Sequence, residues 1–123
     1  MRETKWWAWH MIAGIVIFVL LGLHMLITHF DDILGWFNVL GPSHAIEWEN
    51  VVARAQNIFF AVTYVILLIA ALFHGFYGAR TIICEMNIGV GARKFVDVLF
   101  WLVGLALLIV GTWAAIASMA IKG

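Results

Sequence analysis

The 123-residue sequence has few charged side chains, one proline and one cysteine. Seven basic and seven acidic residues make up 11% of the chain and leave no net charge, whereas soluble domains devote about a quarter of their residues to charge. The charge balance excludes the basic surface that nucleic-acid binding requires. The single cysteine, Cys84, excludes an intrachain disulfide and a Cys-x-x-Cys metal or redox motif.

Three long runs without Asp, Glu, Lys or Arg account for most of the chain. They cover residues 6–30, 55–79 and 98–121, and each is longer than the ~20 residues that cross a hydrocarbon core as a helix. Spans of this length satisfy their backbone hydrogen bonds as α-helices rather than as barrel strands. We therefore expect an all-α integral membrane protein, a single domain over residues 1–123 with three transmembrane helices and no soluble catalytic domain.

The basic residues near the span ends predict how the chain lies in the membrane. One side receives Arg2, Lys5, Arg80, Arg93 and Lys94, and the other receives only Arg54 and Lys122. Because basic residues concentrate on the cytoplasmic side, we expect a cytoplasmic N-terminus in a multi-pass protein of the inner, cytoplasmic membrane. The first run is too long for a secretory signal peptide and has no small-residue cleavage site after it, so it predicts an uncleaved span.

Each predicted helix carries a stripe of small or polar residues at a spacing close to 3.6. The stripe of the third helix, which includes Gly104 and Gly111, contains no histidine. Small residues let membrane helices approach closely, and this explains the third stripe. The stripes of the first two helices hold histidines beside their small residues, and close helix approach does not explain the histidines. The first stripe includes His10, Gly14 and His24, and the second includes His74 and Gly78.

Five histidines are the strongest functional signal, because ionisable groups inside a span are costly in hydrocarbon. At 1.5 Å per residue, His24 lies roughly 24 Å along the first helix, and His74 roughly 9 Å inside the cytoplasmic boundary. Their heights would differ by something on the order of 10–15 Å, which suits two separate sites rather than one small metal ion. Solvation at the span ends explains His10 and His29, and His44 lies in a loop.

Haem ligation is one interpretation of the two deep histidines, His24 and His74. A neutral imidazole is a good axial ligand for iron, and a porphyrin fits between helices where small residues clear space. A structural histidine bonded to a neighbouring helix is another interpretation. Copper and di-iron sites are disfavoured because no histidine or carboxylate stands three or four residues from either one. A histidine-lined transporter or proton path is a further alternative, although inverted repeats and broken helices are missing.

Four segments, in order and over nearly the whole chain, carry a family resemblance. They are Trp6-Trp7 through Gly14, Leu21-Gly22-Leu23-His24-Met25, Leu40-Gly41-Pro42-Ser43, and Leu72-Phe73-His74-Gly75-Phe76-Tyr77-Gly78-Ala79-Arg80. Together they resemble the membrane anchor of succinate:quinone oxidoreductases, which include succinate dehydrogenases and fumarate reductases. The chain is most similar to the second, D-type anchor subunit of the two-haem, two-subunit type.

The resemblance implies a cofactor role for five residues. His74 matches the axial ligand of a proximal haem b near the cytoplasmic side, and His24 matches that of a distal haem b near the outer face. In this family the opposite axial ligands come from the partner anchor subunit. Gly14 and Gly78 would clear space for the haem. Arg80 would lie near haem propionates or the iron–sulfur contact, and a plain positive-inside role for Arg80 stays equally open.

The resemblance also implies partners and a place in the respiratory chain and the tricarboxylic acid cycle. The partners are a second membrane anchor subunit, an iron–sulfur subunit, a flavoprotein subunit, membrane quinone and the lipid bilayer, with no nucleic acid. The chain would pass electrons between the iron–sulfur subunit and quinone, and it would not be an enzyme by itself. The alternatives within this interpretation are a single-haem anchor of the same family and a purely structural anchor or assembly factor.

The position of the quinone is less constrained by the resemblance. The chain departs from single-haem anchors at Met11, where those anchors carry an arginine, and at Met86, where they carry the tyrosine of a quinone site. We therefore expect the quinone near the distal haem. The candidate residues near the distal haem are His44, Glu47 and Glu49, and Glu85 is the candidate at the proximal end, where single-haem anchors carry an aspartate.

Overall fold

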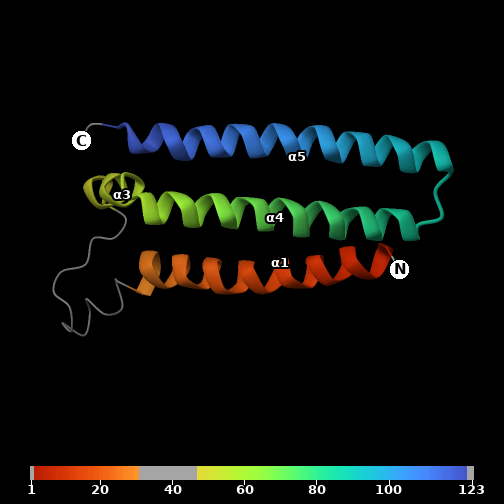
Figure 1. Cartoon of the computed structure of the whole chain (residues 1–123), viewed down its shortest axis with the longest axis horizontal. Helices are drawn as coiled ribbons and strands as arrows, with labels where there is room; N and C mark the ends of the chain where they lie inside the picture. The colour runs from red at the N-terminus through yellow and green to blue at the C-terminus, as the bar shows by residue number, and fades with distance from the viewer. Residues whose placement is uncertain (1, 31–46, 122–123) are drawn as a thin grey trace.

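The computed structural model describes residues 2–30 and 47–121, and this part of the chain is helical almost throughout (Figure 1). The elements are α1 (Arg2–Met25), the π-helix η1 (Leu26–Phe30), α3 (Trp48–Ala55), α4 (Ile58–Glu85) and α5 (Val90–Met119). Three segments are long and apolar enough to cross a membrane: Thr4–Met25, Ile58–Glu85 and Val90–Met119. No strand occurs among the described residues, so the predicted all-α fold with three transmembrane helices is confirmed.

The three long helices lie side by side in a single layer, with α4 in the middle (Figure 1). Helices α1 and α5 run in the same direction, opposite to α4. The buried apolar side chains among the described residues are few, namely Ala13, Val52, Ala61 and Ala70. Three of these are alanines, because the helices touch through small residues while their large apolar side chains point outward. Both faces of the layer are therefore open to lipid or to other subunits.

The helices α4 and α5 extend beyond the charge-free runs of the sequence. Helix α4 continues to Glu85 and α5 begins at Val90, so Arg80 and Asp97 lie within helices rather than in a connecting loop. Long charged side chains at the ends of a span reach the membrane surface while their backbone stays helical, and the charge-free run therefore marks only the apolar middle. In the short turn between the two helices, Asn87 adopts a left-handed backbone with φ of 55°, which asparagine tolerates well.

Three side-chain hydrogen bonds to the backbone lie at the other end of the layer, away from the turn between α4 and α5. The Asn57 side chain accepts a hydrogen bond of 2.9 Å from the backbone N–H of Phe59 and so caps the start of α4. The Gln56 side chain donates to the backbone carbonyl of Ile121, which ties the start of α4 to the end of α5. At the end of α1, the Thr28 hydroxyl donates to the His24 carbonyl at 2.8 Å, where the helix widens into η1. Widened turns of this kind are often found at functional sites.

Candidate functional site

His10 of α1 and His74 of α4 meet at the interface between the two helices. Their ring centroids lie 4.1 Å apart with an interplanar angle of 33°. The His74 Nδ1 lies 3.1 Å from the backbone carbonyl oxygen of His10. Because a carbonyl oxygen only accepts, the hydrogen of this bond belongs to Nδ1 of His74.

Each of these rings packs on a glycine of the opposite helix. A Cβ atom at Gly14 would stand 3.1 Å from Cε1 of His74, and one at Gly78 would stand 3.1 Å from Cε1 of His10. Both distances are shorter than ordinary van der Waals contact, so a larger residue would push the ring away. The space that the glycines clear is therefore filled by the chain's own histidines. The same His-x-x-x-Gly spacing occurs in both helices, and their antiparallel arrangement makes the two contacts reciprocal.

Aromatic side chains extend from the histidine pair toward the N-terminal end of α1. The Tyr77 ring lies 5.1 Å from the His10 ring and 5.7 Å from the Phe73 ring, with which it stacks. Trp6 lies 6.1 Å from Phe73. Within the described residues, Nδ1 of His10 is buried and has no hydrogen-bond partner. The His10 side chain is therefore held by packing, whereas the His74 ring is held by packing and a hydrogen bond.

His24 lies at a separate level of the layer. Its half-buried ring meets the edge of Tyr64 at 5.5 Å and 82°. His24 follows His10 by fourteen residues on α1, about 21 Å, and Tyr64 precedes His74 by ten residues on α4, about 15 Å. His24 and His74, the two predicted ligands, are thus about 15–21 Å apart along the helices. This separation is at or beyond the upper end of the roughly 10–15 Å estimated from the sequence.

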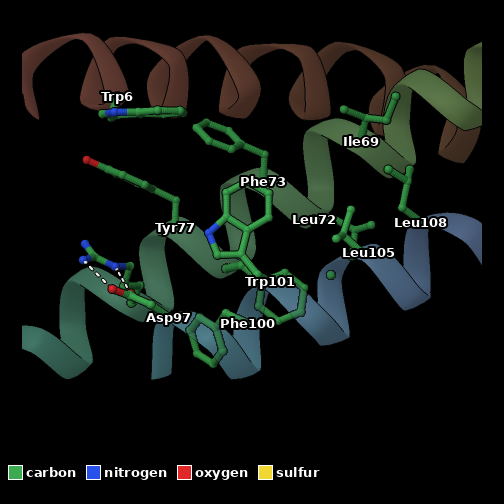
Figure 2. A pocket seen from close by; sticks show the side chains of 13 residues that line it. Trp6, Ile69, Leu72, Phe73, Tyr77, Asp97, Phe100, Trp101, Leu105 and Leu108 are labelled. Carbon is green, nitrogen blue, oxygen red and sulfur yellow. Dashed lines mark hydrogen bonds and ion pairs between the residues drawn. The ribbon is translucent and has the colours of Figure 1, made fainter. Parts of the chain in front are cut away.

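A pocket of about 590 Å³ opens beside the histidine pair, between the N-terminal part of α1, helix α4 and helix α5 (Figure 2). Figure 2 shows Trp6, Phe73 and Tyr77 on one side of the pocket and the α5 residues Phe100 and Trp101 on another. The remaining lining residues are Ile69, Leu72, Phe76, Arg80, Asp97, Gly104, Leu105 and Leu108. A mostly apolar pocket of this size with a few polar groups is typical of sites for small organic molecules.

An ion pair between Arg80 and Asp97 forms the polar part of this pocket. The Arg80 guanidinium contacts the carboxylate through Nε and through Nη2, the latter at 3.3 Å from Oδ2. The pair joins α4 to α5, and each of its two side chains is more than one-third exposed. The Arg80 guanidinium is therefore already paired with a carboxylate of its own chain. The resemblance, by contrast, places Arg80 near the haem propionates or the iron–sulfur contact.

The other candidates from the sequence do not line the pocket, or lie outside the described residues. Glu47 and Glu49 are exposed at the start of α3, and Glu85 is exposed at the opposite end of the layer, where α4 ends. His44 lies outside the described residues, and His29 is exposed in η1. Among the described residues, the structure therefore separates the quinone candidates, with Glu47 and Glu49 at one end of the layer and Glu85 at the other. No group of three or more His, Cys, Asp or Glu side chains within residues 2–30 and 47–121 could hold a metal ion.

The sequence interpretation missed His10, Tyr77, Asp97 and Trp6 as members of the site. For His10, the signal was the repeated His-x-x-x-Gly spacing. For Asp97, it was the need of Arg80 for a counter-charge at the same end of the spans. Trp6 and Tyr77 could not be separated from aromatic residues that lie in the membrane interface.

Comparisons with known proteins agree with the family resemblance. The family described as succinate dehydrogenase/fumarate reductase transmembrane subunit matches residues 2–114. A relative from Archaeoglobus fulgidus, described as a succinate dehydrogenase hydrophobic membrane anchor subunit, is 29% identical over 97 residues, which cover 79% of this chain and 74% of the relative. No solved structure matches the chain significantly.

Proposed function

Because the chain belongs to the family of succinate dehydrogenase/fumarate reductase transmembrane subunits, we propose that it binds haem b at His74 and His24 and connects an iron–sulfur partner with membrane quinone. Family membership makes the chain a multi-pass membrane anchor subunit that associates with the other subunits of its complex. We also propose that the chain lies in the inner membrane and that its N-terminus faces the cytoplasm. The His74 level then lies nearer the iron–sulfur and flavoprotein subunits, and the His24 level lies nearer the outer face.

The hydrogen bond from His74 to the His10 carbonyl is the observation that carries the proposal. Histidines that bind a metal usually donate their other ring N–H to a carbonyl or carboxylate, which fixes the ring and its tautomer. With the proton on Nδ1, the lone pair of the neutral imidazole is on Nε2, the atom that would bind iron. His74 therefore fits an axial position. Haem b, when bound, supplies a reversible one-electron carrier whose potential depends on its ligands and surroundings.

The described part of the chain offers one suitable histidine at each level. His10 is beside His74, but its ring is occupied by packing on Gly78 and Tyr77. At the other level, the ring of Tyr64 supports His24 from the side. His74 and His24 would each hold one haem, and a histidine from the partner anchor subunit would complete each site. The remaining side chains at the α1–α4 interface would orient the ligands and exclude water.

Haem content in the purified complex tests this assignment. We expect His74→Ala to remove one haem b per chain and His24→Ala to remove the other, with His29→Ala, an exposed histidine of η1, as the control that keeps both. A full haem content in His24→Ala together with loss in His74→Ala would favour a single-haem anchor. Absence of b-type absorption with histidine-dependent ion flux in vesicles would favour a transporter. Unchanged spectra and activity in both variants would leave a purely structural anchor.

We place the quinone head group in the pocket between α1, α4 and α5 that Trp6, Tyr77 and Trp101 help to line. The flat apolar walls suit a ring that stacks on aromatic side chains, and the Tyr77 hydroxyl and the Arg80–Asp97 pair are polar groups along its lining. This location lies on the His74 side of the chain and differs from the position near the distal haem that the resemblance favours. It also lies apart from Glu47 and Glu49.

A substitution that fills the pocket tests the quinone location. Leu105→Trp adds bulk to the pocket lining, so we expect a KM for quinone at least several-fold higher while haem content stays unchanged. Leu107→Trp is the matched control, because Leu107 is exposed on the same helix and does not line the pocket. An unchanged KM in Leu105→Trp would place the quinone elsewhere.

A further inference from the structure

We infer that the main-chain carbonyl of His10 is the positioning group for His74, and that Gly14 is required because it leaves this carbonyl open. The carbonyl holds the His74 imidazole in the tautomer that keeps Nε2 free to bind iron. The inference rests on the proposed function, since it assumes that His74 is a haem ligand. It assigns to His10 a role that its side chain does not perform.

Helix geometry explains why the His10 carbonyl is accessible. In an α-helix this oxygen accepts one hydrogen bond from the backbone N–H of the residue four positions later, which is Gly14. A carbonyl oxygen has a second lone pair, and it can accept a further bond from the side. Because the Cα–Cβ bond of a helical residue tilts toward the N-terminus, a side chain at position 14 would lean over the carbonyl of residue 10. Glycine at position 14 leaves that approach open.

The position of the His74 ring agrees with this account. A Cβ atom at position 14 would lie 3.1 Å from Cε1 and 3.3 Å from Nδ1 of His74, and Nδ1 is the atom bonded to the His10 carbonyl. An alanine at position 14 would therefore act directly on the bonded edge of the imidazole. By contrast, a Cβ atom at Gly22 of the same helix would meet nothing within 4 Å.

The His10 ring contributes packing rather than a second hydrogen bond. It lies 4.1 Å from the His74 ring and occupies the space over Gly78. Its Nδ1 is buried and has no hydrogen-bond partner among the described residues. The His10 ring thus limits rotation of the His74 ring, while the His10 backbone fixes which nitrogen of His74 carries the proton.

Replacement of Gly14 by alanine in the intact complex tests the inference. Loss of the hydrogen bond from Nδ1 makes the imidazole a poorer electron donor to iron, because such bonds raise ligand basicity. We expect Gly14→Ala to raise the midpoint potential of the haem that His74→Ala removes, and to shift the low-spin g values of that haem. Gly22→Ala, the matched control on α1, should leave the potential and the g values unchanged.

His10→Ala separates the backbone from the side chain. This variant removes the ring but keeps the carbonyl, so we expect the haem to stay bound. Its midpoint potential should differ from the wild-type value by less than the midpoint potential of Gly14→Ala does. Loss of the haem in His10→Ala would make the His10 ring a ligand and overturn the inference. Wild-type potential and g values in Gly14→Ala would also overturn it.

A measurement on the wild-type complex covers the case in which Gly14→Ala does not assemble. The quadrupole coupling of the remote imidazole nitrogen, measured by pulsed electron paramagnetic resonance, reports whether Nδ1–H donates a hydrogen bond. We expect the value of a hydrogen-bonded nitrogen at the His74 haem, and the value of a nitrogen with no acceptor would overturn the inference. If the wild-type complex contains no haem, the proposed function fails before the positioning role can be measured.

Discussion

At the scale of single residues, the site depends on polar groups that find partners within a mostly apolar layer. Arg80 pairs with Asp97, and His74 donates to the His10 carbonyl. An unpaired polar group inside a membrane is costly, so each contact restricts how the helices can be placed against one another. The two contacts differ in exposure, because both side chains of the ion pair are more than one-third exposed while His74 is half-buried between α1 and α4.

The exposure of the Arg80–Asp97 pair predicts a small effect on stability. Both side chains are more than one-third exposed, so we expect Asp97→Asn to lower the free energy of unfolding by only about 0.2–1 kcal/mol. The charge-swapped variant Arg80→Asp with Asp97→Arg should recover most of the loss. Thermal melting of the complex in detergent at low and high salt measures both effects. A loss of several kcal/mol, or a swap no better than the single variant, would contradict a screened and partly exposed pair.

His10 shows where prediction from the sequence stops at this scale. The sequence places His10 at a span end, where solvation explains it, but the structure places its half-buried ring against His74 and Gly78. That contact depends on the register of α1 against α4, which no local pattern determines. The separation of His24 and His74 along the layer differs from the His10 contact, because helix rise gives its order of magnitude from the sequence. The spacing in the structure is nevertheless at or above the upper end of the roughly 10–15 Å estimated from the sequence.

At the scale of elements, the three transmembrane helices follow from hydropathy and length, and their ends do not. Hydrocarbon requires backbone hydrogen bonds to be satisfied internally, so the charge-free runs predict helices directly. The sequence gives no comparable signal for α3 or η1, since both are short and lie near charged or polar residues. Nor does it show that α4 continues through Arg80 to Glu85.

The packing of α4 against α5 gives a prediction at the element scale. A Cβ atom at Gly111 would collide with a terminal methyl of Leu68, whereas one at Gly104 would meet Phe76 at an ordinary 3.6 Å. We expect Gly111→Ala to cost about 1 kcal/mol, at the low end for overpacking because the leucine methyl can rotate. Gly104→Ala is the control and should melt like the wild type.

A double variant isolates the contact between α4 and α5. Leu68→Ala removes the methyl that the new Cβ would meet, so Gly111→Ala should have little further effect on the melting temperature in that background. An equal loss in both backgrounds would show that Gly111 acts through something other than Leu68.

At the scale of the whole molecule, a single layer of three helices cannot enclose a cofactor by itself. Both faces of the layer are open, and large apolar side chains such as Phe18, Trp101 and Trp113 are strongly exposed. Such surfaces are covered by lipid or by the other subunits of the complex. On the function proposed above, the partner anchor subunit would cover one of these faces and would supply the second ligand of each haem.

The haem content of the intact wild-type complex tests the central claim most directly. The reduced-minus-oxidised spectrum, calibrated as the haem derivative in pyridine and divided by the amount of this chain, gives the number of b-type haems per anchor. We predict two, one at the level of His74 and one at the level of His24. A fully assembled complex that shows no b-type absorption would contradict the account.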